Sequence, residues 1–363
     1  MAYLRQSLQW NGHEVRCVDD EIPLPGPSEC ALKLTSLGLC SSDFHIWNGR
    51  KSGKHGILGH EGCGEVVAVG SGVHGWTPGD RAIVNPLLNC AECEDCLAGR
   101  GQICRHRQII GYNGAGLMAS IQLLDARSLV RPPGSLPPVH GCLVEPLSCV
   151  VHGQKRLRRT HPESSMLIVG CGSMGALHAA YAKHRGVERV LIVDPDPGKL
   201  GLARLHGVPA DEWLPLENVR ERVLACLNGT GPEVSVIATS CRSGHELAFD
   251  LTADGGQILA FASILDAPGP IDLPMGAFDS DKVHSLEETV QVVSWSGSVS
   301  VAGTIGFDSE SFAEAAELLA GKIDGEQFIT GSVTLDQVPA LIGGAWQRHL
   351  KILVRPQARI EIH

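Results

Sequence analysis

Four cysteines stand close together in one short segment, at Cys90, Cys93, Cys96 and Cys104. Their Cys-x2-Cys-x2-Cys-x7-Cys spacing suits a single zinc ion, because four thiolates complete its tetrahedral coordination. With every position filled by protein, none is left open for a substrate, so the spacing predicts a structural zinc site. The alternative is four unrelated cysteines, free or in disulfide bonds, and it does not explain the regular spacing.

A second set of potential zinc ligands lies outside this segment. Cys40 offers a thiolate and His60 an imidazole, and the carboxylate that would complete the set is either Glu61 or Glu145. Glu145 stands among apolar residues, where an acid is costly unless it is bound to something. Three protein ligands leave one position for water or a substrate oxygen, so this set predicts a catalytic metal site. Taken singly, the same residues have ordinary explanations, since a lone cysteine usually serves as a small buried hydrophobe.

A glycine-rich turn follows the apolar run Met166–Val169 and precedes an alanine-rich stretch. The residues of this turn that we expect to contact a dinucleotide are Gly170, Gly172, Ser173, Met174 and Gly175. In a strand–turn–helix context, the first glycine permits the turn, the second lets the backbone approach a pyrophosphate, and the third allows close packing of helix and strand. The alternative is that the glycines are simple turn residues.

Asp194 ends the next expected strand, where its carboxylate can accept hydrogen bonds from the hydroxyl groups of an adenosine ribose. The same carboxylate would repel a 2′-phosphate. No arginine follows directly, because Pro195, Asp196 and Pro197 occupy the next positions. The sequence therefore favours NAD over NADP, with a helix N-cap as the alternative role of Asp194.

The elements that must position these residues change in character near Pro162. Before it, short β-branched runs are broken by glycine and proline, which predicts an irregular β domain. After it, apolar strands alternate with helical stretches, which predicts a parallel sheet with helices on both faces. We expect strands at 166–169, 190–193, 234–238, 257–262 and 351–354, and helices at 173–184, 198–206 and 311–320.

Composition excludes several classes of protein. The 363 residues suffice for two domains, and 40 acidic against 30 basic residues give a formal net charge of −10, which disfavours nucleic acid as a partner. The segment Met1–Asp20 lacks the apolar core of a signal peptide, and no apolar run is long enough to span a membrane. We therefore expect no membrane partner. Four of the thirteen cysteines are clustered as ligands and many others lie in apolar or glycine-rich runs, so we expect a reducing, cytoplasmic location.

The order of these motifs resembles that of the zinc-dependent medium-chain alcohol and polyol dehydrogenases. The segments that carry the resemblance are Gly38–His45, Gly59–Gly70, Gly79–Arg81, the four-cysteine segment, Val144–Ser148 and the glycine-rich turn. The resemblance implies an α/β fold in which a GroES-like β domain, formed by 1–155 and 296–363, carries the zinc lobe at 86–108. It also implies a Rossmann domain, a doubly wound parallel sheet, over 156–295.

The resemblance further implies roles for individual residues. Cys40, His60 and Glu145 would hold the catalytic zinc, and Glu61 would be either a direct ligand or a neighbour that exchanges with water. Ser42 and His45 match positions of a proton relay, Asp43 would orient His60, and Lys199 would support the adenosine ribose. Glutamate in Val144–Leu147 is similar to the sorbitol dehydrogenase branch and favours a polyol or cyclitol substrate.

The implied activity is a zinc- and NAD-dependent interconversion of a secondary alcohol and its ketone by hydride transfer. Two zinc ions per subunit, a small-molecule substrate and a homodimer or homotetramer are expected. The alternatives are a simple alcohol or threonine-type dehydrogenase of the same family, and a catalytically silent NAD-binding protein. The segment 273–300 is longer than usual, and Ala119–Ile121 replaces a usual Ala-Glu-Tyr, so substrate and assembly stay open.

Overall fold

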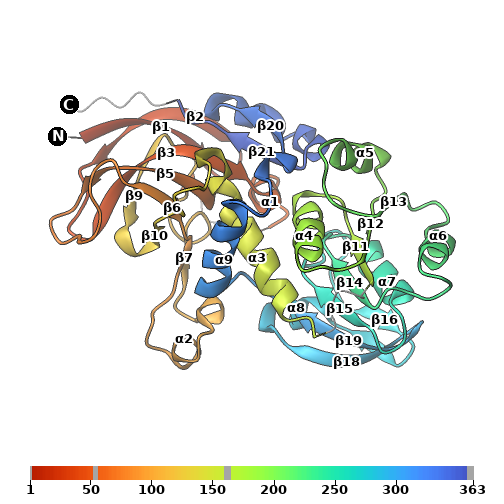
Figure 1. Cartoon of the computed structure of the whole chain (residues 1–363). Helices are drawn as coiled ribbons and strands as arrows, with labels where there is room; N and C mark the ends of the chain where they lie inside the picture. Colours follow the sequence, from red (N-terminus) through yellow and green to blue (C-terminus); the bar gives the residue numbers. More distant parts are fainter. Residues whose placement is uncertain (1, 52–55, 159–164, 358–363) are drawn as a thin grey trace.

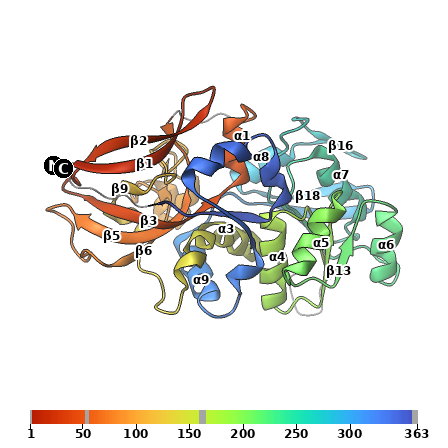
Figure 2. The ribbon, with the colours of Figure 1, turned by 90° about the horizontal axis from the view of Figure 1, so that it is seen from above.

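The computed structural model describes residues 2–51, 56–158 and 165–357. A part built mainly from β-strands lies beside a sheet flanked by helices (Figure 1). The helix α3 (Val144–Lys155) lies between the two parts in both ribbon views (Figures 1 and 2). The expected α/β class is therefore confirmed.

A seven-stranded sheet forms the core of the helix-flanked part, in the order β13-β12-β11-β14-β15-β19-β18. Its strands are β11 (Ser165–Val169), β12 (Arg189–Val193), β13 (Glu212–Leu214), β14 (Val234–Ile237), β15 (Gln257–Ala260), β18 (Thr289–Ser294) and β19 (Gly297–Gly303). All pairings are parallel except that of β18 with β19. The strand order reverses beside β11, and such a switch point is where ligands bind in open α/β sheets.

Helices cover both faces of this sheet because its central strands are apolar on both sides. One face packs against α3, α4 (Ser173–His184), α5 (Pro197–Leu205) and α9 (Ser309–Leu319). The other face packs against α6 (Val219–Cys226), α7 (Arg242–Leu251) and α8 (Ser280–Leu286). The doubly wound arrangement follows from these two cores.

A second seven-stranded sheet forms the β-strand part, in the order β10-β6-β5-β3-β21-β20 with β9 paired to β3. Its strands are β3 (Glu29–Leu39), β5 (Glu61–Val69), β6 (Arg81–Val84), β9 (Ile121–Asp125), β10 (Leu129–Val130), β20 (Ile329–Val333) and β21 (Lys351–Val354). A smaller sheet contains β1 (Ala2–Trp10), β2 (Val15–Pro23) and β4 (Gly56–Ile57). The remaining short elements are β7 (Leu87–Leu88), β8 (Gln108–Ile109), β16 (Ile271–Leu273), β17 (Gly276–Phe278), α2 (Glu94–Leu97) and the 3-10 turns at 101–103, 126–128, 138–143, 325–327, 335–341 and 345–348.

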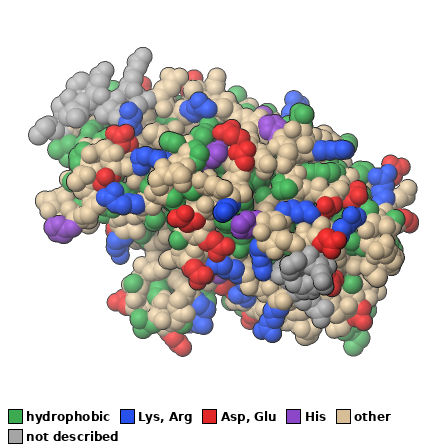
Figure 3. All heavy atoms as spheres, in the orientation of Figure 1, with side chains coloured by type: hydrophobic (Ala, Val, Ile, Leu, Met, Phe, Trp, Pro, Cys, Tyr) green, Lys and Arg blue, Asp and Glu red, His purple; other side chains and the backbone are tan. Residues whose placement is uncertain are grey.

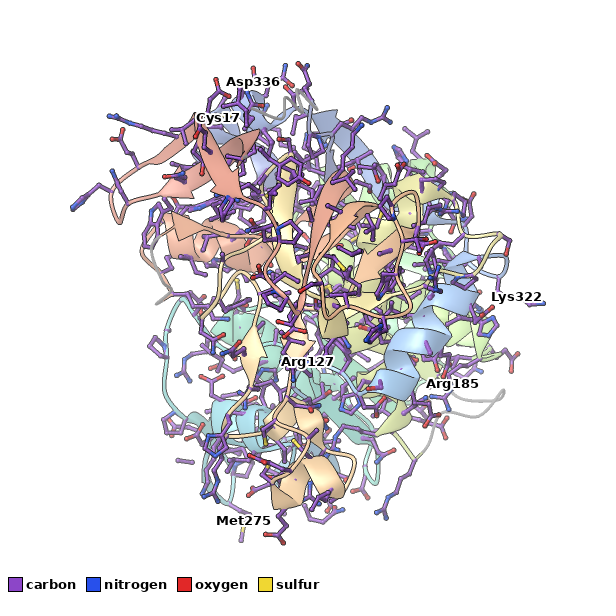
Figure 4. All side chains as sticks on the ribbon, turned by 90° about the vertical axis from the view of Figure 1, so that its left-hand side faces the viewer. Cys17, Arg127, Arg185, Met275, Lys322 and Asp336 are labelled. Atoms are coloured by element: carbon purple, nitrogen blue, oxygen red, sulfur yellow. The ribbon has the colours of Figure 1, made fainter. Side chains whose placement is uncertain are left out.

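The segment after α9 returns to the β-strand part. β21 pairs antiparallel with β3, and its residue Ile352 lies opposite Leu39. The 3-10 turn at 335–341 packs against β1 and β2, where Cys17 lies near Asp336 (Figure 4). The sheet is therefore completed by strands from opposite ends of the described chain.

The boundary expected between residues 295 and 296 falls inside the β18–β19 hairpin. β19 forms a parallel ladder with β15 in which Ile258 pairs with Val301. Cutting the chain at 295 would separate two strands that share one sheet. We propose instead that the parallel-sheet domain extends to Gly303, the last residue of β19.

The surface carries both signs of charge. Acidic and basic side chains are interspersed over the face drawn in Figure 3, with no broad field of basic residues on it. None of the helices in the described part of the chain has the length and apolar character needed to cross a membrane.

A buried ionic junction joins three parts of the molecule. His152 of α3 lies with its Nε2 2.8 Å from Oε1 of Glu287, which ends α8, and with its Nδ1 3.1 Å from Oδ2 of Asp308, which caps α9. Gln102, from the turn between two of the clustered cysteines, donates to Oε2 of Glu287 at 2.9 Å. Burial lowers the pKa of His152, but Asp308 and Glu287 outweigh it and raise the pKa to about 9. A protonated His152 therefore ties the cysteine segment to both domains.

We expect His152→Ala to lower the free energy of unfolding by about 3 kcal/mol near neutral pH, because two carboxylates lose their shared cation. Since the pKa rises from 6.5 to about 9 on folding, this contribution is complete below pH 6.5 and is lost as the pH rises through 9. Urea unfolding of wild type and variant on both sides of that window measures it. His13→Ala, at an exposed position, is the control. An equal difference between wild type and His152→Ala on both sides would contradict the assignment.

Candidate active site

One cluster of candidate ligands forms where β3 meets β5. Cys40 follows β3 and occupies the N-cap position of α1 (Ser41–Trp47). The antiparallel register pairs Gly38 with Glu61, which brings Cys40 beside His60 and Glu61. One ligand atom from each of these three side chains lies within 4.8 Å of the others. The structure thus brings together the thiolate, the imidazole and the nearer of the two candidate carboxylates.

Close packing fixes the position of the Glu61 carboxylate. Glu61 is fully buried, and a Cβ on Gly38 would lie 2.0 Å from its Oε2. Any other residue at position 38 would displace the carboxylate, so glycine is required there by this close approach.

Lys351, the first residue of β21, is the partner of Glu61. Its Nζ lies 2.7 Å from both carboxylate oxygens and also donates to the Leu39 carbonyl oxygen at 3.3 Å. Lys351 is 2 % exposed, and burial lowers its pKa, but the charges of Glu61 and Cys40 raise the pKa above its ordinary value. The charge of Glu61 is therefore already balanced by a protein cation.

Asp43 lies behind His60. One oxygen of Asp43 accepts a hydrogen bond from the Cys40 backbone N–H at 3.1 Å, and the other lies 3.8 Å from Nδ1 of His60. That oxygen and that nitrogen are both buried and lack a hydrogen-bond partner among the described residues. A small rotation of the ring would join them, and metal-bound histidines commonly donate their second N–H to a carboxylate in this way.

The surroundings of His60 are strongly anionic. Burial lowers the pKa of His60, but Cys40, Asp43 and Glu145 raise it well above the ordinary value for histidine. The same field would stabilise a metal ion placed between the thiolate and the imidazole. A sulfur, nitrogen and oxygen donor set in such a field fits zinc.

Glu145 lies beside this cluster, in the first turn of α3, without joining the three-residue group. Its Oε1 accepts a hydrogen bond from the Cys149 thiol at 3.6 Å. Burial raises the pKa of Glu145 to about 7, with His60 opposing and Glu61 adding to the shift. In the described part of the chain no cation pairs with Glu145, unlike Glu61.

The two residues expected to form a proton relay, Ser42 and His45, lie on one face of α1, because they are three positions apart. The Ser42 hydroxyl is buried and lacks a partner among the described residues, whereas His45 is half-buried. Burial, Arg50 and Lys51 lower the pKa of His45, which favours a neutral ring able to accept a proton. The pair thus leads from a buried oxygen to a partly accessible base.

Two residues of this site escaped the sequence analysis as functional candidates. The sequence analysis placed Lys351 only in an expected strand. A lysine within an apolar strand suggests a buried acidic partner, because lysine is rarely buried unless it is paired. The Tyr112 ring lies 5.2 Å from the His60 ring, and burial together with the charge of Cys40 raises the pKa of Tyr112 well above its ordinary value. No spacing rule links Tyr112 to the ligands, because the contact is made only in the fold.

The four-cysteine segment forms a closed site. The sulfur pairs Cys90–Cys104 and Cys93–Cys96 are 3.5 Å apart, and the pairs Cys90–Cys96 and Cys93–Cys104 are 3.8 Å apart. A tetrahedral zinc ion with bonds of about 2.3 Å needs sulfur separations of about 3.8 Å. Backbone N–H groups of Glu92 and Cys93 lower the pKa of Cys90 to about 6, which supplies a thiolate at neutral pH. The geometry fits zinc without an open position.

The glycine-rich turn lies between β11 and α4, with Ser173 and Met174 in the first turn of that helix. A Cβ on Gly175 would lie 1.9 Å from the Gly170 carbonyl oxygen, so this packing requires glycine. Around Gly172 the space is open, and no side chain caps the helix. Free N–H groups at such a helix start fit a pyrophosphate.

Asp194 braces the glycine-rich turn from the end of β12. Its oxygens accept hydrogen bonds from the backbone N–H of Cys171 at 2.7 Å and of Asp196 at 2.9 Å. The cap of α5 is Asp196, which accepts from the Gly198 N–H at 2.8 Å, so the N-cap alternative for Asp194 is wrong. Lys199 lies in α5, and its carbonyl oxygen accepts from the Cys171 thiol at 3.8 Å.

A cavity of about 570 Å³ opens beside Asp196. Its other walls come from the far end of the chain and include Gly343, Gly344 and Arg348. An arginine therefore lines the same cavity as Asp196, although no arginine directly follows Asp194 in the sequence.

Comparison with known proteins identifies the family. Residues 26–134 match the alcohol dehydrogenase GroES-like domain. L-threonine 3-dehydrogenase of Pyrococcus horikoshii is 30% identical over 254 residues, which are 68% of this chain and 72% of that protein. L-galactonate-5-dehydrogenase of Escherichia coli is 27% identical over 85% of this chain and 86% of its own length.

Solved structures agree with this result. A candidate zinc-binding dehydrogenase of Sinorhizobium meliloti, bound to NADP, has a TM-score of 0.82 and 25% identity, and the match covers 97% of this chain and 99% of that one. The chain belongs to the zinc-dependent medium-chain alcohol and polyol dehydrogenase family. It is an oxidoreductase with a GroES-like domain and a Rossmann-type parallel sheet.

We expect two zinc ions per subunit, measured by elemental analysis of the purified protein. Cys93→Ser should lose one ion and unfold more readily, because metal binding and folding of the lobe are linked. Cys40→Ser should lose the other ion and the activity while staying folded. Cys226→Ser, outside both clusters, is the control and should keep both. One zinc ion or none in the intact protein would refute the pair of sites.

Proposed function

We propose that this enzyme oxidises a secondary alcohol of a polyol or cyclitol-like substrate with NAD, and reduces the ketone in reverse. The observation that carries the proposal is the Cys40, His60 and Glu61 cluster with Glu145 beside it. When bound, zinc supplies Lewis-acid polarisation of an alcohol oxygen and NAD supplies the hydride acceptor. The relatives named for threonine and galactonate act at positions 3 and 5, which supports an internal carbon as the reacting centre.

The protein's own residues would bind, orient and move the proton. Cys40, His60 and a carboxylate would hold the metal, and Asp43 would keep the His60 ring in place. Ser42, whose buried hydroxyl meets no hydrogen-bond criterion with any described residue, would take the proton of the substrate alcohol and pass it toward His45. A neutral His45 ring has a free nitrogen lone pair that can accept that proton.

Glu61 and Glu145 would have different roles at the metal site. Lys351 neutralises Glu61, so a charge-balanced Glu61 would serve as an occasional ligand or a neighbour of the metal. Glu145 has no such cation among the described residues, so a bound metal ion would neutralise its charge. We therefore favour Glu145 as the third ligand, directly or through water.

Assembly into a homodimer or homotetramer is supported by the edge of the parallel sheet. β18 pairs only with β19 among the described residues, so its outer edge is free to pair with a second copy. Val293 and Trp295 are 43% and 49% exposed there.

Thirteen unbridged cysteines support a cytoplasmic, reducing location.

Cofactor preference provides a first test. Activity with NAD should exceed that with NADP by at least about tenfold, equivalent to roughly 1.4 kcal/mol, because Asp194 repels a 2′-phosphate. Asp194→Ser should narrow the ratio, because it removes the carboxylate that would repel the 2′-phosphate. The ratio of kcat/KM values is the readout, and equal use of both cofactors by the wild type would contradict the proposal.

Glu145 provides a second test. A carboxylate donates less charge to a metal than a second thiolate and leaves room for a neighbouring substrate hydroxyl, so vicinal diols should outperform monoalcohols in kcat/KM. Glu145→Ala should lose zinc and that preference, while Glu145→Gln should keep the shape and lose most of the activity. If Glu145→Ala retains its zinc and its activity, Glu145 is only structural. Preference of the wild type for a short monoalcohol would exclude a polyol substrate and favour the simple alcohol alternative.

A further inference from the structure

A cationic group stands one aromatic ring away from the ligand cluster. The Nζ of Lys51 lies over the Tyr112 ring, 5.0 Å from its centroid, and that ring lies 5.2 Å from the His60 ring. Contact with an aromatic face holds an ammonium group in place and favours it over free solvent positions. The Lys51 charge is therefore held on the ring that packs against His60.

The backbone fixes Lys51 relative to the cluster. The N–H groups of Arg50 and Lys51 both donate to the His45 carbonyl oxygen, at 2.8 Å and 3.1 Å, at the end of α1. Cys40 caps the other end of the same helix. One short helix thus sets the distance between the candidate ligand and the cation.

Neither Arg50 nor Lys51 forms an ion pair with any residue that the structure describes. In a chain with a formal net charge of −10, two uncompensated cations beside the site are not a consequence of composition. Of the nearby carboxylates, Asp43 is 1 % exposed and Glu61 is bound to Lys351, so neither neutralises Lys51. Glu145 lies beside the cluster and forms no ion pair with Lys51 among the described residues. The positive potential is available to a ligand.

The long segment 273–300 supplies a second wall near Lys51. Its helix α8 is anchored by Asp281, which accepts from the Ile264 N–H at 2.9 Å, and by His284, whose Nδ1 lies 3.1 Å from the Ala260 carbonyl oxygen. Burial lowers the pKa of His284, and the nearby Lys51 lowers it further. A neutral His284 that donates from Nδ1 keeps Nε2 as an acceptor, which suits a substrate hydroxyl.

We infer that the substrate carries an anionic group, a carboxylate or a phosphate ester, and that Lys51 binds it while the reacting hydroxyl lies at the ligand cluster. This inference rests on the proposed function and narrows its substrate class to acidic polyols. Lys51 is a specificity-determining residue, and Tyr112 positions it.

Matched substrate pairs test the inference. Each pair is an alditol with either its aldonate or its monophosphate, so that the members differ only in the anionic group. For the wild type, kcat/KM should be at least about tenfold higher for one anionic form, and salt should reduce this advantage. The two arms distinguish a carboxylate from a phosphate.

Lys51→Gln should lower kcat/KM for the anionic member about tenfold more than for the neutral member, mainly through KM. Lys322→Gln is the control, because Lys322 is exposed at the edge of the molecule, away from the site (Figure 4). A loss that is equal for both members, or an increased KM for NAD in place of the substrate, would overturn the inference. So would a wild type that oxidises both members equally well. If neither member of any pair is oxidised, the proposed function fails as well.

Discussion

The ion pair between Lys351 and Glu61 is the constraint on which the candidate site depends. Both side chains are almost fully buried, so each would be costly without the other. Two contacts of 2.7 Å and a hydrogen bond to the Leu39 carbonyl compensate that cost. Since Leu39 immediately precedes Cys40, the pair also fixes the backbone that carries the thiolate.

This pair separates two carboxylates that the sequence alone does not distinguish. Glu61 lies closer to Cys40 and His60, yet its charge is already balanced. Glu145 lies outside the group of Cys40, His60 and Glu61, and burial raises its pKa, which reflects the cost of a buried charge without a paired cation. Distance to Cys40 and His60 thus favours Glu61 as the metal ligand, whereas the lack of a neutralising cation favours Glu145. We give more weight to the charge argument.

The parts of the molecule that could be predicted from the sequence are those encoded by short spacings. The helix expected at 173–184 and the strand expected at 351–354 coincide with α4 and β21, because a glycine-rich turn and a β-branched run are local signals. The four cysteines also come together as their spacing predicts. Each of these features depends on residues that are near one another in the chain.

Features that depend on topology were not predictable in this way. The contacts of Tyr112 with His60 and of Lys351 with Glu61 join distant segments, and no periodicity announces them. The expected boundary at 295 lies within a hairpin, because β18 and β19 pair inside a sheet whose other strands are linked by helices, and we propose Gly303 in its place. The sequence predicts that Asp194 faces a ribose. Its hydrogen bonds with the Cys171 and Asp196 N–H groups show that it also stabilises the glycine-rich turn, which is apparent only in the folded structure.

The distance in sequence between Lys351 and Glu61 has a consequence for biosynthesis. The two residues are 290 positions apart, so at 5–20 residues per second a ribosome adds Lys351 roughly 15–60 s after Glu61. Throughout that interval β3 lacks its β21 neighbour, and its exposed edge can pair with other chains. An incomplete β domain is therefore exposed to aggregation during synthesis, and the Lys351–Glu61 pair cannot fix the backbone before Cys40 until β21 has been added.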